Sequence, residues 1–150
     1  MAITCALMGS GEMVLPSSEC TPGEQRTFTA QELKKYNCHS QRCVACTPDK
    51  PRAYIPVGRK RIILMREGFT ESSFEGKFDH RFPHWAGGTD SLENLWAYPG
   101  KPAFPKDRLE SYARTRYCLK KNLRMSTIKN WFMGDWRKAY ARYDIRNWPL

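Results

Sequence analysis

The clearest helical periodicity lies in the last third of the chain. Between about Lys106 and Leu119, apolar side chains recur every three or four positions, which places them on one face of a helix. A longer stripe follows Ser126, a favourable N-cap residue. Its members are Ile128, Trp131, Phe132, Asp135, Trp136, Ala139, Tyr140 and Tyr143. We therefore predict a helix over 106–119 and one C-terminal helix whose stripe joins the core.

Two shorter helices are predicted earlier in the chain. Thr29 and Glu32 have the spacing of a capping box, which predicts a helix ending near Tyr36. Residues 57–69 predict a second helix that ends at Gly68, because glycine readily adopts the left-handed conformation found after helices. The residues expected to share its apolar face are Ile62, Met65 and Phe69.

A pair of strands is predicted between these helices. Residues 74–79 and 92–97 are the two strands, and the loop between them turns at Gly87-Gly88. A proline-rich connector leads to the helix at 106, and proline is tolerated where a helix begins. A hairpin followed by a helix, with further helices before and after, indicates an α+β fold.

The length of 150 residues and a hydrophobic content of 41% fit one domain with a real core. Residues 1–25 are rich in Gly, Pro and Ser, and we predict an irregular arm there. Residues 26–150 form the predicted domain. Its parts are a cysteine-rich subregion at 26–56, a core at 57–120 and a basic helix at 121–150.

The net charge of +10 is concentrated at the C-terminal end. Residues 101–150 hold thirteen Lys or Arg against four Asp or Glu, whereas residues 1–50 are balanced. A polyanion is the natural partner for such a face. No apolar stretch approaches the ~20 residues that span a bilayer, and no convincing signal peptide is present, so we expect a cytoplasmic protein without membrane contact.

The residues between 78 and 110 have the chemistry of a phosphodiesterase site. A neutral histidine such as His80 accepts a proton from water near pH 7. Mg²⁺ or Mn²⁺ needs only one or two carboxylates, which Asp79 and Asp107 would supply. Asp79 and His80 are adjacent on the predicted strand and therefore point to opposite sides.

The ordered motifs Asp-His-x-x-Pro-x-x-x-Gly-Gly, Asn-Leu-Trp, Lys-Asp-x-x-Glu and Asp-Trp-x-x-Ala-Tyr resemble the HNH, or ββα-metal, endonucleases. They are most similar to small bacterial and phage HNH-like proteins, over roughly residues 46–143. The resemblance implies a hairpin and site helix holding one divalent metal. It assigns His80 as general base, Asn94 as the residue that orients His80, Asp79 as a metal ligand, and Asp107 or Glu110 as the helix ligand.

Basic residues on the predicted helices are the candidates for nucleic-acid contact. Arg137, Lys138 and Arg142 fall on the side of the C-terminal helix away from its apolar stripe. Lys106 and Arg108 flank Asp107 at the start of the site helix. Such residues contact phosphates and position a strand without reading its sequence. DNA is the expected partner ahead of RNA, with low sequence specificity.

The cysteines allow three arrangements. Cys20, Cys38, Cys43 and Cys46 offer four sulfurs for a structural Zn²⁺, with one tight Cys-x-x-Cys pair. The HNH-like resemblance instead implies a disulfide from Cys43 or Cys46 to Cys118. In a reducing cytosol all would stay free thiols.

The sequence therefore predicts a divalent-metal-dependent HNH-type endonuclease. Two alternatives remain open. One is a catalytically inactive protein that binds nucleic acid or serves as a structural subunit of a nucleoprotein assembly. It is motivated by His84, which stands where the family usually has an apolar residue. The other is a zinc-stabilised regulator built on the N-terminal cysteines.

Overall fold

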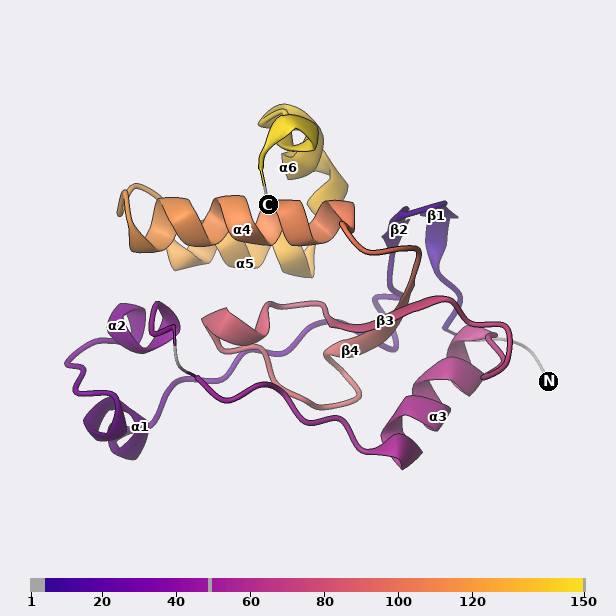
Figure 1. Cartoon of the computed structure of the whole chain (residues 1–150), viewed down its shortest axis with the longest axis horizontal. Coiled ribbons are helices and arrows are strands. Elements are labelled where there is room, and N and C mark those ends of the chain that lie inside the picture. The colour runs from indigo at the N-terminus through magenta and orange to yellow at the C-terminus, as the bar shows by residue number, and fades with distance from the viewer. Residues whose placement is uncertain (1–4, 49, 150) are drawn as a thin grey trace.

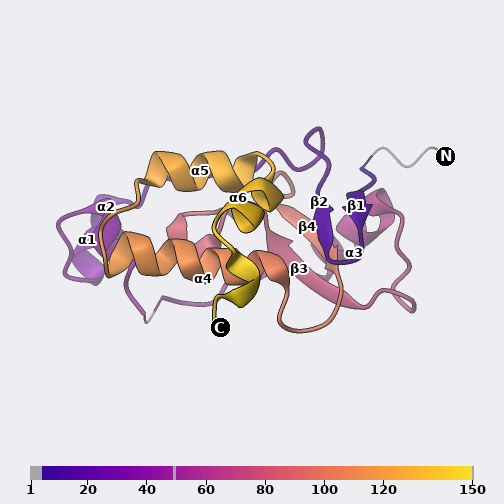
Figure 2. The same cartoon turned by 90° about the horizontal axis from the view of Figure 1, so that it is seen from above.

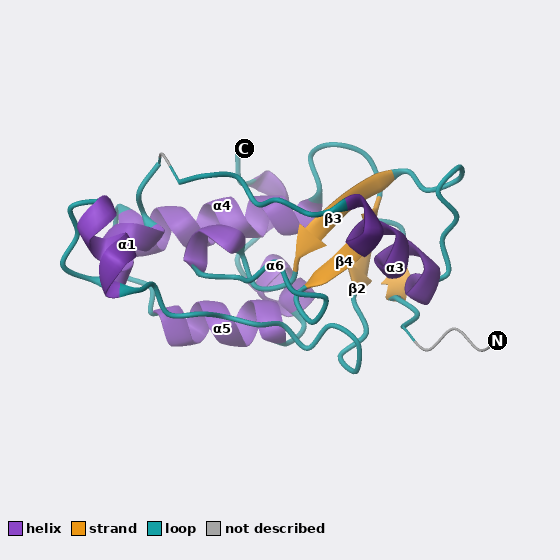
Figure 3. Cartoon of the chain, turned by 90° about the horizontal axis from the view of Figure 1, so that it is seen from below, coloured by secondary structure: helices purple, strands orange, loops and turns teal. Residues whose placement is uncertain are grey.

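The computed structural model describes residues 5–48 and 50–149. The chain forms two antiparallel hairpins, six α-helices and two 3₁₀ turns in these residues, so the α+β prediction is confirmed. In chain order the elements are β1 (Met8–Ser10), β2 (Met13–Leu15), α1 (Ala30–Lys35), α2 (Gln41–Ala45), α3 (Val57–Glu67), β3 (Gly76–His80), η1 (His84–Ala86), β4 (Leu95–Pro99), α4 (Pro105–Cys118), α5 (Met125–Met133), α6 (Trp136–Arg142) and η2 (Ile145–Asn147). Figure 3 shows the strands gathered at one end of the molecule and α1 with α2 at the other.

The central hairpin is formed by β3 and β4, and α4 follows it directly. Asp79 pairs with Trp96, and His80 pairs with Leu95. Pro105 is the first residue of α4, where its missing N–H costs nothing because that group has no helical partner. The predicted order of strand, strand and helix is therefore present, with strand boundaries shifted by one to three residues.

Strand β4 is buried on both faces. Trp96 and Tyr98 belong to the main apolar cluster with residues of α4, α5 and α6. Leu95 and Ala97 point the other way and pack with Ile63 of α3. Figure 1 shows α4 and α3 on opposite sides of the hairpin, and Figure 2 shows α6 beside the start of α4. A strand covered on both sides holds the site hairpin in one position relative to α4.

The predicted apolar face of the helix at 57–69 is wrong for Ile62 and Met65, whereas Phe69 packs against the apolar cluster under α3. Ile62 and Met65 are exposed, whereas Ile63 and Leu64 face β4. Glu67 lies on this inner face as well, where its carboxylate accepts a hydrogen bond from the Ala97 amide at 2.9 Å. Burial raises the pKa of Glu67 to about 7. The orientation of α3 is thus set by its contacts with β4. One of these is the polar contact of Glu67, which a pattern of apolar residues does not reveal.

The predicted single C-terminal helix is two helices, α5 and α6, separated at Gly134. Ser126 is not the N-cap, which falls at Arg124 without a side-chain bond. Asp135 is not a core residue, because it caps α6 by accepting from the Arg137 amide at 3.0 Å. The apolar part of the stripe is buried as predicted, namely Ile128, Phe132, Trp136 and Ala139.

A buried arginine explains the break. The Arg81 guanidinium donates to the carbonyls of Phe132, Met133 and Gly134, which lie at the end of α5. Helix ends leave such carbonyls without partners, and a side chain that binds them stabilises the termination. The same guanidinium donates to Thr21 O at 2.7 Å, so it also ties down the N-terminal segment.

The prediction of an irregular arm at residues 1–25 is wrong where it can be compared, because its residues 1–4 lie outside the described residues and the rest contains a hairpin. Residues 8–15 form the β1–β2 hairpin, and Val14 and Leu15 are buried in the main apolar cluster. The Tyr98 hydroxyl donates to Glu12 O, and the Trp136 indole donates to Val14 O. Residues 5–25 are therefore part of the same folded unit as the site hairpin.

All six cysteines form disulfides: Cys5–Cys20, Cys38–Cys43 and Cys46–Cys118. The proposed Zn²⁺ site at Cys20, Cys38, Cys43 and Cys46 is therefore wrong, as is the free-thiol alternative, because each sulfur is already bonded. The pairing of Cys46 with Cys118 is confirmed. Three disulfides are typical of oxidising compartments and argue against the cytoplasmic expectation. In the described part of the chain, no helix has the length and apolar character that a bilayer crossing requires.

The disulfides are expected to differ in their contribution to stability. Cys46 and Cys118 are 72 positions apart, whereas Cys38 and Cys43 are five apart. A cross-link restricts the unfolded chain more when it closes a longer loop. Replacing Cys46 and Cys118 with serine should lower the free energy of unfolding by about 4 kcal/mol, and replacing Cys38 and Cys43 by about 2 kcal/mol. Urea unfolding of the two variants measures both, and equal losses would contradict the loop-length argument.

Candidate active site

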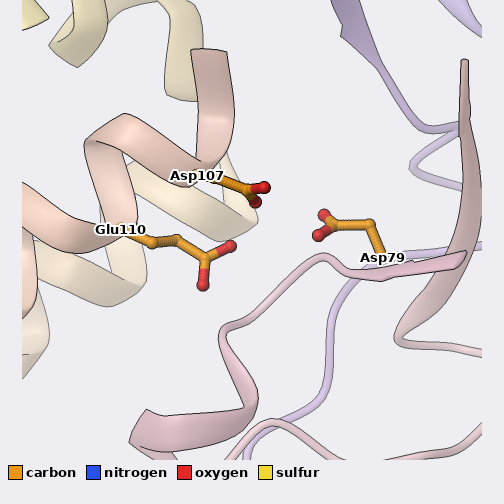
Figure 4. Close-up of side chains that lie close together, drawn as sticks. All are labelled: Asp79, Asp107 and Glu110. Carbon is orange, nitrogen blue, oxygen red and sulfur yellow. The ribbon is translucent and has the colours of Figure 1, made fainter. Parts of the chain in front are cut away.

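The end of β3 and the first turns of α4 bring three carboxylates together. Asp79, Asp107 and Glu110 each offer an oxygen, and these oxygens lie within 4.8 Å of one another. Figure 4 shows the two helix carboxylates directed toward Asp79 on the strand. The spacing arises because Asp107 and Glu110 are three residues apart on α4 and so share one side of the helix. The sequence analysis named all three, and the structure brings them together.

A buried lysine lies inside this carboxylate group. Lys106 is fully buried, and its Nζ lies 2.8 Å from Asp79 Oδ2 and 2.6 Å from Glu110 Oε2. Its third acceptor is His80 O, at 2.8 Å. An ammonium has three N–H donors, so all of them are satisfied. The prediction that Lys106 contacts nucleic acid is therefore wrong, because no ligand reaches a side chain enclosed in this way.

A second lysine lies on the outer side. Lys77 Nζ is 3.3 Å from Asp79 Oδ1 and 2.5 Å from Asp107 Oδ1. About a third of the surface of the Lys77 side chain is exposed to solvent. Asp79 completes its contacts by accepting from the Trp96 indole at 3.0 Å. Two ammonium groups thus face three carboxylates, which leaves the group with one excess negative charge when all five are ionised.

Burial and these ion pairs set the protonation of the group. Burial alone would raise the pKa of Asp79, but Lys106 and Lys77 outweigh it and lower that pKa. Burial raises the pKa of Glu110 to about 7 against the opposing effect of Lys106, and the neighbouring Asp79 and Asp107 add to the rise. Burial would lower the pKa of Lys106, but Asp79 and Glu110 raise it. Asp79 is therefore a permanent anion, whereas Glu110 is partly protonated near neutral pH.

The donor set fits a hard divalent cation at one place. Asp79 and Asp107 offer carboxylate oxygens on either side of Lys77 Nζ, so a lysine ammonium stands where a cation would lie. A metal at this position would have to displace the partly exposed Lys77 ammonium from Asp79 and Asp107. Two carboxylates with retained waters suffice for Mg²⁺. Glu110 fits less well as a ligand, because its oxygen is bonded to the enclosed Lys106.

On the opposite side of β3, His80 is held by a carboxylate. Its Nε2 lies 2.7 Å from Asp90 Oδ1. When Asp90 is ionised it can only accept, so the Nε2 proton points at Asp90 and Nδ1 carries the lone pair. The His84 ring lies next to it, with 5.1 Å between ring centroids. Burial lowers the pKa of His84, and His80 lowers it further. The imidazole rings of His80 and His84 are thus neighbours, one at the end of β3 and one at the start of η1.

Asn94 does not orient the His80 ring. Its Oδ1 accepts from the Phe82 and Glu24 amides at 2.8 and 3.0 Å, and its Nδ2 donates to Phe82 O and Thr89 O. Asn94 therefore closes the loop between β3 and β4 and joins it to the N-terminal segment. The His80 ring is hydrogen-bonded instead to Asp90.

The remaining basic candidates are on or near the surface. Lys138 and Arg142 are exposed on α6. Arg137 is bound to Asp135, with its Nε 2.9 Å from Oδ1, and Arg108 donates to Trp148 O at 2.6 Å. Arg137 and Arg108 thus have structural partners, whereas Lys138 and Arg142 keep their charge available.

Sequence reasoning missed Lys77, Asp90 and Arg81. Lys77 had a usable signal, because it is two residues before Asp79 and so on the same face of a strand. Asp90 and Arg81 had no such signal. The partner of Asp90 is His80, on the other side of the loop between β3 and β4. The partners of Arg81 include Gly134, 53 positions away in the sequence. The chain matches no protein-family model, and no curated protein and no solved structure is significantly similar to it.

Proposed function

We propose that this protein is a divalent-metal-dependent endonuclease of the HNH type that hydrolyses phosphodiester bonds in nucleic acid. The observation that supports this most is the arrangement at the end of β3. His80, fixed by Asp90, is adjacent in sequence to Asp79, and Asp79 faces Asp107 across the cation position filled by Lys77. A base and a cation-binding pair are the two parts that phosphodiester hydrolysis needs.

The protein's own residues would work as follows. Nδ1 of His80 removes a proton from a water as its oxygen attacks phosphorus, and Asp90 stabilises the imidazolium that forms. The bond from phosphorus to the 3′ oxygen breaks, and that oxygen takes a proton from solvent water, so the products are a 3′ hydroxyl and a 5′ phosphate. A metal held by Asp79 and Asp107 would act as Lewis acid on the phosphate when bound. Lys106 links His80 O to Asp79 and so keeps the base and the metal ligand in register.

Cleavage assays test the proposal directly. Supercoiled plasmid and single-stranded RNA are each incubated with the disulfide-bonded protein and Mg²⁺, Mn²⁺ or a chelator. We expect cleavage with the metals and none with the chelator. Asp107→Asn should require a higher Mg²⁺ concentration, because one ligand is weakened, whereas Asp144→Asn on the exposed surface should leave the metal dependence unchanged. Absence of cleavage of both substrates with either metal would reject the proposal.

The ion pairs that Lys77 and Lys106 form with the carboxylates favour one alternative function, namely binding nucleic acid without cutting it. Lys77 and Lys106 neutralise much of the charge that would attract a metal. A protein with this fold that binds nucleic acid without cutting it would have the same surface. Retained nucleic-acid binding without cleavage in the assay above would select that alternative.

A further inference from the structure

A basic cavity of about 220 Å³ lies beside His84. Four cationic side chains line it, together with one carboxylate: Arg26, Lys35, Lys50, Arg52 and Glu32. The cavity is smaller than most pockets for drug-sized ligands, but it is large enough for several water molecules. The cavity therefore suits a small anion such as a phosphate group.

The backbone of Arg26 and the ammonium of Lys50 are hydrogen-bonded to the turn that carries His84. The Arg26 amide donates to Gly87 O at 2.9 Å, and Gln25 bridges to Gly88. From the other side, Lys50 Nζ donates to Trp85 O at 2.5 Å and Ala45 O at 3.2 Å. These bonds place Arg26 and Lys50 on either side of one short turn. The cavity is thus assembled from three segments rather than being a chance cluster on one helix.

The charges in the cavity are not fully compensated. Glu32 pairs with Arg26 alone, through oxygens 2.6 and 2.7 Å from its two terminal nitrogens. Lys50 uses two of its three ammonium protons on carbonyls, and its Nζ also lies 5.0 Å from the centroid of the Phe28 ring, so within the described residues no carboxylate neutralises it through an ion pair. Burial, with Arg114 and Arg26 nearby, lowers the pKa of Lys50 to about 8. Lys35 and Arg52 are exposed at the rim and form no ion pair with any residue that the structure describes. An anion would relieve this repulsion.

We infer that this cavity binds a backbone phosphate of the nucleic-acid strand, next along the strand from the phosphate attacked at His80. The inference rests on the proposed function, because His84 lines the cavity and its ring centroid lies 5.1 Å from that of His80. A strand that crosses the η1 turn would contact the cavity and the imidazole pair in succession. The cavity thus supplies a positioning site outside the carboxylate group.

Histidine NMR signals test the inference without any need for cleavage. The chain has three histidines, and His39 is exposed in a separate loop. Inorganic phosphate and an uncleavable phosphorothioate DNA hexamer are titrated separately. Both should shift the His84 ring signal and raise the pKa of His84, because the added anion opposes the positive field of Lys50 and Arg26, while His80 and Asp90 stay in place. The His39 signal should not move.

A pair of matched variants isolates the cavity from general charge. Lys35→Gln with Arg52→Gln removes the two rim cations, and Lys34→Gln with Lys120→Gln removes two exposed cations elsewhere. We expect the rim variant to bind hexamer about three- to tenfold more weakly than the control variant, since exposed charges contribute modestly. Equal affinities, or a His84 signal that phosphate and hexamer leave unmoved, would overturn the inference. A response to phosphate but not to hexamer would reassign the cavity to a free phosphate ligand.

The two proposals fail separately. A protein that cuts nothing but shows the His84 response would retain the phosphate site and lose the nuclease. A protein that cuts normally with unchanged KM in the rim variant would retain the nuclease and lose the phosphate site.

Discussion

Replacing His80 with alanine is expected to reduce cleavage by about 10²–10⁴-fold, the usual contribution of a general base. The ring is oriented by Asp90 at 2.7 Å, so its Nδ1 lone pair is available to accept the proton of water. Its removal should leave nucleic-acid affinity nearly unchanged, because the cationic side chains remain. Single-turnover cleavage rates and binding isotherms of the variant measure the two quantities.

His39→Ala is the matched control for this experiment, since His39 is exposed and outside the site. Asp90→Asn adds a second test, because it keeps the size of the side chain but removes its charge. We expect a smaller loss of rate than with His80→Ala. If His80→Ala cleaves at the wild-type rate, another residue is the general base, and His84 is the next candidate because its ring is the neighbour of His80.

Replacing Lys106 with methionine is expected to lower the free energy of unfolding by about 3–5 kcal/mol at neutral pH, because removing one partner leaves buried charges without compensation. Asp79 and Glu110 both lose an ion pair, at 2.8 and 2.6 Å. Methionine has a similar length but carries no charge, so the variant also loses the contact of the Lys106 ammonium with the Phe132 ring, 5.1 Å from Nζ to the ring centroid. Chemical unfolding at pH 7.5 measures the loss.

The loss should shrink as the solution is acidified. In the wild type, the folded-state pKa of Asp79 is lowered, so its stabilisation is present above the unfolded pKa of about 3.9 and is lost as pH falls through the lower, folded value. In the variant only Lys77 still opposes the effect of burial on Asp79, so both carboxyls bind protons more readily than in the wild type and the deficit shrinks as pH falls. Lys138→Met, at an exposed position, should change stability by less than about 0.5 kcal/mol at either pH. A pH-independent deficit would mean that lost packing, rather than uncompensated charge, causes the effect.

Local signals in the sequence were sufficient for much of the fold. The Thr29–Glu32 capping box, the end of α3 at Gly68 and the start of α4 at Pro105 depend on neighbouring residues only, and all three are present. Asp79, Asp107 and Glu110 were named as a group from the motif order that resembles HNH endonucleases, and their carboxylates do lie together.

What could not be predicted depends on distant partners. The break at Gly134 is stabilised by Arg81, more than 50 positions earlier. Lys106 appears in the sequence as a surface cation, and only the packed structure shows that Asp79 and Glu110 enclose it. The role of Asn94 likewise depends on backbone groups of Glu24, Phe82 and Thr89 that meet only in the fold.

The contact between the first hairpin and α6 has a consequence for how the chain folds. The Trp136 indole and Val14 O are 122 positions apart, yet they form one of the buried hydrogen bonds of the main cluster. During synthesis, Val14 therefore has no access to this partner until a segment 122 residues later has been made. Contacts of such long sequence separation slow folding and prolong the exposure of apolar surface.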